Sequence, residues 1–334
     1  MSAARQLFLC AATCAAWAGP VDFGKQEFAS ALSERKLAAS RYRIQAEVST
    51  EAPESFRIAG ARISGGDLRG LMYGLLEAAE QIRSTGRLAA AKGAATIRVR
   101  GVRLTVSAAD LDRRAYWEEL LQALARSRLN RLNLVFEEDR ALDPRALEAL
   151  RLISETATAY AVDLVLSIHP ESVHADGVEL KAVLSGCPAI RSVQITGVGP
   201  GRLELVRAIG DAGRRVVLEI PHQDLTASIL DEVADKGVPW LVSAAYTGQS
   251  PPEVAGAEAL VWRLEARGAE WTDPAFVRKT LQELTKPGAV GFEIEAPRAA
   301  SPETNRLLRL IWGRLSYDPK TPETVWGGKP VKKK

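Results

Sequence analysis

Cysteine, histidine and methionine are all scarce in this sequence of 334 residues, which holds three, three and two of them respectively. Two of the cysteines, Cys10 and Cys14, lie close to the N-terminus, so a chain that lost this segment would keep only Cys187 and could form no internal disulfide. The three histidines show no paired spacing, so we expect no metal site, and no pattern indicates a cofactor. Stability must therefore come from a hydrophobic core, which a chain of this length can bury.

Long apolar runs and a strong charge are also missing. After residue 18 no run is long and apolar enough to cross a bilayer as a helix. The net charge is +3, and four lysines fall within the last six residues, so the rest of the chain is nearly neutral and has no electrostatic basis for general nucleic-acid binding. The remaining composition, 46% hydrophobic and 25% charged, is that of a globular protein. We expect residues 319–334 to form a C-terminal tail whose last part, GGKPVKKK, is frayed and solvated.

The N-terminus has the three parts of a secretory signal peptide in order. MSAAR carries a positive charge, QLFLCAATCAAWA is a short apolar core, and Ala16-Trp17-Ala18 is a small-residue cleavage site before Gly19. These features predict a signal peptide over residues 1–18 and a secreted or periplasmic protein. The alternative is a hydrophobic helix that begins the folded chain.

Residues 19–98 have the pattern of a small α/β domain. After a polar helical lead-in, two alternating stretches predict strands at Tyr42–Val48 and Phe56–Ile63. Asp67 is a suitable N-cap for a long helix that begins at Leu68 and carries one apolar face.

From residue 99 onward short β-rich runs alternate with helical patterns. Eight such runs within about 200 residues are typical of a (β/α)8 barrel, which we predict over residues 99–318, so the fold class is α/β with a TIM-like barrel. An open, doubly wound parallel sheet is the alternative. The predicted strands are 101–106, 131–136, 162–168, 191–196, 215–220, 239–244, 259–266 and 288–295, and a helix at 302–315 closes the pattern.

Several segments resemble a known group of proteins. These segments include ISGGDLRGLMYGLLEAAEQIRSTGRL, VRGVRLTV, YWEELLQALARSRLNRLNLVFEE, WLVSAAYTGQ and GFEIEAP. They are similar to bacterial glycoside hydrolases, the alpha-glucuronidases and their beta-N-acetylhexosaminidase-like relatives, which join an N-terminal α/β domain to a catalytic (β/α)8 barrel. The resemblance implies hydrolysis of O-glycosyl bonds in polysaccharides or oligosaccharides. It also implies an acidic proton donor after the fourth strand, but the matching stretch ITGVG has no carboxylate.

Hydrolysis of a glycosidic bond needs two carboxyl groups, which in a barrel stand at the C-terminal ends of the strands. The candidates are Glu137 (with Glu138 beside it), Glu219, Glu293 and Glu295. Glu293 and Glu295 alternate with apolar residues, so both are predicted to face the barrel interior. Glu219 lies between apolar neighbours, which would raise its pKa and suit a general acid. The alternative for these carboxylates is a structural ion pair, in the last strand with Arg263 or Arg267.

Six further residues in or shortly after predicted strands are candidates for binding sugar. Arg267 would bind a carboxylate, the two histidines would bind hydroxyls or a carboxylate, and the aromatic side chains would stack on sugar rings. A structural role in the core or in hydrogen bonding is the alternative for each. The candidates are His169, His222, Tyr246, Trp262, Arg267 and Trp271.

Two functions therefore remain open from the sequence. The first is a secreted glycoside hydrolase, and the second is a catalytically inactive barrel that binds carbohydrate or a partner protein. The glycine-rich stretch at 197–201 lacks the third glycine of a dinucleotide-binding motif, so we interpret it as a turn.

Overall fold

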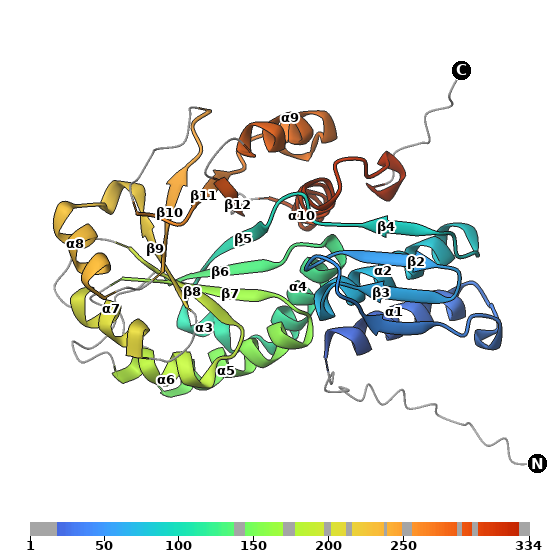
Figure 1. Cartoon of the computed structure of the whole chain (residues 1–334), viewed down its shortest axis with the longest axis horizontal. Helices are drawn as coiled ribbons and strands as arrows, with labels where there is room; N and C mark the ends of the chain where they lie inside the picture. The colour runs from blue at the N-terminus through green and yellow to red at the C-terminus, as the bar shows by residue number, and fades with distance from the viewer. Residues whose placement is uncertain are drawn as a thin grey trace, which may run out of the picture.

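The computed structural model describes residues 19–136, 144–169, 178–196, 202–211, 216–236, 239–248, 256–285, 289–295 and 300–326. The predicted signal peptide, the glycine-rich stretch and the end of the predicted tail lie outside these residues. The described chain forms a small sheet with two helices beside a closed barrel (Figure 1).

The small sheet has four strands in the order β1-β3-β2-β4. The prediction of one strand over residues 56–63 is wrong, because the chain turns at Gly60, whose φ of +60° suits glycine, and returns antiparallel. The 42–48 strand is shorter than predicted, and β4 was not predicted. The elements are α1 (Pro20–Glu34), a 3-10 turn (Ala39–Arg41), β1 (Gln45–Val48), β2 (Phe56–Ala59), β3 (Arg62–Gly65), α2 (Leu68–Thr85) and β4 (Ala91–Gly93).

Helix α2 packs directly on the small sheet. The Asp67 side chain caps it by accepting a hydrogen bond from the Gly70 backbone N–H at 2.6 Å, which confirms the predicted start. Two glycines on the buried face allow the close approach. A Cβ at Gly70 would lie 2.2 Å from the Ser55 carbonyl oxygen, and one at Gly74 would lie 2.8 Å from Ile63 Cγ2.

The barrel contains eight parallel strands, and the last of them, β12, pairs with the first, β5. This closure confirms the predicted (β/α)8 barrel, and the open-sheet alternative is wrong. The strands are β5 (Val99–Val106), β6 (Arg131–Phe136), β7 (Asp163–Ile168), β8 (Ile190–Ile195), β9 (Val217–Pro221), β10 (Trp240–Ala245), β11 (Leu260–Glu265) and β12 (Ala289–Glu295).

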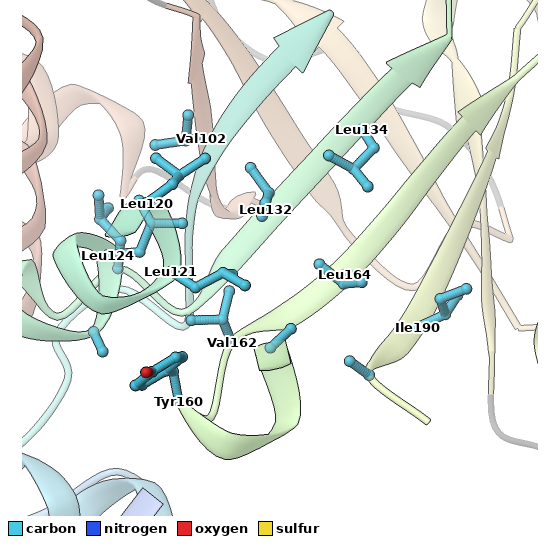
Figure 2. Close-up of a cluster of buried hydrophobic side chains, with 14 of the residues drawn as sticks. Val102, Leu120, Leu121, Leu124, Leu132, Leu134, Tyr160, Val162, Leu164 and Ile190 are labelled. Carbon is cyan, nitrogen blue, oxygen red and sulfur yellow. The ribbon is translucent and has the colours of Figure 1, made fainter. Parts of the chain in front are cut away.

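Helices surround the barrel and cover the outer faces of its strands. Figure 2 shows Leu120, Leu121 and Leu124 of α4 directed toward Val102 of β5 and Leu132 of β6, all of them buried. None of the described helices has both the length and the apolar character that a membrane span requires. The helices are α3 (Ala108–Leu111), α4 (Arg114–Ser127), α5 (Pro144–Ala159), α6 (Val178–Gly186), α7 (Arg202–Asp211), α8 (Ala227–Lys236), α9 (Pro274–Leu284) and α10 (Pro302–Tyr317), with 3-10 turns at His222–Asp224, Ala269–Thr272 and Glu323–Trp326.

The small sheet β1–β4 with α1 and α2, which we call the small domain, packs against the N-terminal ends of the barrel strands. Arg69 of α2 donates from Nε to the Ala161 carbonyl, two residues before β7, at 2.7 Å. Tyr317, at the end of α10, donates from its hydroxyl to the Glu54 carbonyl at 2.6 Å. These contacts place the small domain opposite the C-terminal mouth, which is the end where barrel enzymes hold their active sites.

Candidate active site

The inner face of the barrel is strongly polar, whereas the interior of such a barrel is usually filled with branched apolar side chains. Side chains alternate along each strand, so the polar residues point into the barrel and the apolar residues between them point outward into the helix layer. The inward polar residues are Arg103, Arg131, Asn133, Ser167, Gln194, Glu219, Ser243, Arg263, Glu293 and Glu295.

Toward the N-terminal ends of the strands, this interior holds an ion-pair cluster centred on Arg131. Its Nε donates to Glu293 at 2.7 Å, and its Nη2 binds Glu219. Asn133 adds a hydrogen bond of 2.6 Å to the second oxygen of Glu293. Gly101 of β5 lies in register between Arg131 and Glu293, and a Cβ there would stand 3.0 Å from Glu293 Cγ. A glycine at this position therefore leaves room for the pair to form across β5.

Both carboxylates of this cluster are withdrawn from solvent. Glu219 is 0% exposed and Glu293 is 1% exposed. Burial raises the pKa of Glu219 and the charge of Glu293 acts in the same direction, while Arg131 opposes both. Burial alone would lower the pKa of Arg131, but the two carboxylates outweigh it and raise that pKa. The predicted ion pair with Arg263 or Arg267 is wrong for Glu293, whose shortest ion pair in the described chain is with Arg131.

A hydrogen-bonded layer above this cluster leads toward the mouth. Gln194 Oε1 accepts from Arg103 at 2.8 Å, from Asn133 at 3.3 Å and from the Ser167 hydroxyl. The Gln194 amide nitrogen donates to Ser243 at 2.6 Å. Strands β5, β6, β7, β8 and β10 therefore each supply a polar side chain whose partner stands on another strand, and the bond to Gln194 fixes the orientation of Arg103.

Two carboxylates occupy the C-terminal rim of the barrel. Glu295 of β12 faces the interior as predicted, lies 3.8 Å from Arg103, and has a side chain that is 38% exposed. Glu265 of β11 stands in register with Glu295. It lies on the same inner face of the strand as Arg263, because the two are two residues apart. Its side chain is 56% exposed and receives a 3.0 Å hydrogen bond from Arg267 Nε. Glu265 was not among the predicted residues, although alternation along the seventh predicted strand places it on the inner face.

Two arginines of the inner face, Arg103 on β5 and Arg263 on β11, lie near enough below this rim to affect each other's charge. Arg263 donates from Nη2 to the exposed Gln223 at 3.0 Å, and its buried Nε has no hydrogen-bond partner in the described chain. Burial lowers the pKa of Arg263, and the nearby charge of Arg103 acts in the same direction. An anionic group between the two guanidiniums would relieve this repulsion and give the Arg263 Nε–H an acceptor.

The remaining predicted residues near strand ends have different positions. His169 directly follows β7, and His222 is exposed at the start of the turn after β9. Tyr246 follows β10 and is half-buried; burial and a hydrogen bond to Glu283 raise its pKa to about 12. Glu137, with Glu138, lies outside the described residues, as does the loop after β8 where the resembled family has its acid.

The roles expected for the two tryptophans need correction, while that of Arg267 stays a prediction. Trp262 is 4% exposed and points outward into the core, because it alternates with the inward Arg263, so its ring has no face for a sugar. Trp271 stacks on Trp312 at 5.3 Å and accepts a hydrogen bond from its indole, which is a packing role. Arg267 is exposed and its guanidinium is bound to Glu265. Within the described residues no group of three or more His, Cys, Asp or Glu side chains could hold a metal ion.

Comparison with known proteins supports the fold. No protein-family model matches the sequence, and no curated protein matches it either. Among solved structures, the chain is similar to a GH138 enzyme targeting pectin rhamnogalacturonan II, with a TM-score of 0.67, 13% identity, and coverage of 90% of this chain and 50% of that one.

Two GH84 structures are also similar. CpGH84D has a TM-score of 0.56 at 10% identity, with coverage of 91% of this chain and 65% of that one. CpGH84B has a TM-score of 0.53 at 12% identity, with coverage of 91% and 67%. The chain thus spans about half to two thirds of the length of these glycoside hydrolases, and at such low identity the likeness shows a shared barrel fold.

Proposed function

We propose that this protein is a glycoside hydrolase that acts on acidic saccharides at the C-terminal mouth of its barrel, with Glu295 and Glu265 as its two carboxyl groups. The observation that carries the proposal is the register between these residues, which sets two inward, solvent-reachable carboxylates side by side on neighbouring strands. Glycosidases need such a pair.

The depth of each side chain suggests its role. Glu295 lies deeper, beside Arg103, and is assigned to attack on the anomeric carbon. Glu265 is nearer to solvent and is assigned to protonation of the departing oxygen. Neighbouring strands are about 4.8 Å apart, which is near the roughly 5–5.5 Å between carboxyl groups in retaining enzymes. We therefore expect the anomeric configuration to be retained.

Arg103 and Arg263 support an acidic substrate. Two guanidiniums on the inner face, one with an unused buried Nε–H, match the carboxylate of a uronic acid better than neutral hydroxyls. The resemblance to alpha-glucuronidases favours the same substrate class. The similarity to an enzyme that targets a pectin component makes pectin fragments a second probe.

A barrel that binds carbohydrate without cleaving it is the second candidate function. Arg131 favours it, because it binds both Glu219 and Glu293 and so engages two of the predicted acids in buried ion pairs. In that case Glu265 and Glu295 would only contact the ligand.

Product analysis separates the two functions. The purified protein is incubated with acidic oligosaccharides from rhamnogalacturonan II and from glucuronoxylan, and released sugars are followed by chromatography and proton NMR. Release of a sugar with retained configuration supports the proposal. Binding by calorimetry without any release supports the second candidate, and neither binding nor release contradicts both.

We also propose that the protein is exported and that the mature chain begins near Gly19. The first described helix begins at Pro20, so cleavage after Ala18 would leave every described element intact. N-terminal sequencing of protein from the native host should start at or near Gly19, and an intact Met1 on the accumulated protein would contradict export.

A further inference from the structure

A second pocket lies at the opposite end of the barrel from the mouth. It has a volume of about 190 Å³ and is formed where the N-terminal ends of β5 to β8 meet the small domain. Arg98, Arg131, Arg191 and Ser192 line it from the barrel, together with Asp163, and Arg69 lines it from α2. We refer to it as the basal pocket. The proposed hydrolase makes no use of it.

The carboxylates around the basal pocket are already bound. Asp163 lies 3.0 Å from Arg69 and 3.8 Å from Arg191. Glu54, also in the wall, binds Arg69 at 2.7 Å and Arg100. Neither carboxylate is therefore left to attract a cation into the pocket.

Two guanidinium groups, in contrast, keep unused donors. The exposed Arg98 side chain has no ion pair or hydrogen bond with any described residue. Arg131 uses Nε and Nη2 on Glu293 and Glu219, and its Nη1 has no hydrogen bond within the described chain. Arg131 is only 6% exposed, so its charge acts in a poorly solvated place.

The charge balance of the surroundings is positive. Five arginines (69, 98, 100, 131 and 191) stand against four carboxylates (Glu54, Asp163, Glu219 and Glu293). Planar guanidiniums and a serine hydroxyl suit a tetrahedral or planar oxyanion.

We infer that the basal pocket binds a small oxyanion of the size of inorganic phosphate, held by Arg98, Arg131 and Arg191. An anion that binds the folded chain there stabilises it by mass action, and all three arginines that hold it belong to the N-terminal end of the barrel.

Calorimetry with inorganic phosphate tests this inference on the full chain at constant ionic strength, with sulfate as a second probe and chloride as the control anion. We expect saturable phosphate binding with a raised thermal midpoint, and an affinity at least tenfold weaker in Arg98→Gln. Arg98 is exposed and without a partner in the described chain, so the variant should fold normally. Arg57→Gln, on the small sheet and paired only with Glu51 among the described residues, makes the same charge change as a matched control and should bind as wild type does.

Two results would overturn the inference: no phosphate binding by the wild type, or equal affinity in Arg98→Gln and Arg57→Gln. A variant at the mouth keeps the outcome separate from the proposed hydrolase, because Arg263→Gln should bind phosphate normally in the basal pocket. Loss of phosphate binding in Arg263→Gln would place the anion at the mouth and contradict the basal pocket.

Discussion

Glu54 joins the small domain to the barrel, and its replacement should cost much more stability than that of an exposed glutamate. Its carboxylate accepts hydrogen bonds from Arg69 at 2.7 Å, from Asn130 at 2.8 Å and from Arg100. Arg100 is 0% exposed. Glu54→Gln would leave this buried guanidinium without its countercharge, and breaking a buried pair from one side costs about 3–5 kcal/mol.

The matched control is Glu51→Gln, three residues earlier. Glu51 pairs with Arg57 on the surface, where the two side chains are 37% and 57% exposed, and such pairs contribute about 0–1 kcal/mol. Urea unfolding followed by tryptophan fluorescence gives both free energies of unfolding. The reasoning fails if Glu54→Gln loses no more than Glu51→Gln does.

The pH dependence provides a second check on Glu54. Burial acts to raise the pKa of this carboxyl, but Arg100 and Arg69 outweigh it and hold the pKa below its usual range. A lowered pKa stabilises the fold above the unfolded value of about 4.3, and that contribution is lost as the pH falls through the folded pKa. The stability gap between wild type and Glu54→Gln should therefore narrow below about pH 4.3. A constant gap would argue against the ion pairs as its cause.

Three further predictions concern the barrel and α2. Glu219 has a raised pKa, so its favourable contribution is present below about pH 4.3 and is lost as the pH rises; unfolding curves should show Glu219→Gln gaining on wild type from about pH 4 to 7, and a pH-independent difference would refute this. Gly101→Val would push into Glu293 and should cost about 1–3 kcal/mol by thermal unfolding, so an unchanged midpoint would show that the glycine is not needed. Asp67→Ala removes a helix cap and should cost about 1 kcal/mol in urea unfolding, whereas no measurable loss would contradict the capping role.

Local sequence patterns were sufficient to predict the barrel strands. All eight were predicted to within two residues at each end, because each is a short apolar or alternating run between helical patterns. The hairpin at Gly60 was missed because β2 and β3 follow one another across a two-residue turn with one glycine as its only signal. Turns of this kind depend on backbone geometry more than on hydrophobic pattern.

The candidate site could be predicted only in part. The alternation of polar and apolar residues correctly predicted that Glu293 and Glu295 face the interior. The partner of Glu293 could not be found this way, because barrel closure brings Arg131 to it from 162 residues away and to Glu219 from 88 residues away. The sugar-binding role predicted for Trp262 was wrong, because that prediction did not take account of the alternation that places this side chain on the outer face of its strand.

The central claim is that Glu295 takes part in cleavage, and the specificity constant of its glutamine variant tests it most directly. Glu258→Gln is the matched control, because Glu258 is an exposed glutamate that precedes β11 at the opposite end of the barrel. On the acidic oligosaccharide that the wild type cleaves best, we predict that kcat/KM falls by roughly 10²–10⁴-fold in Glu295→Gln and is unchanged in Glu258→Gln, while calorimetry still shows saccharide binding by both. A Glu295→Gln variant with wild-type kcat/KM would contradict the account.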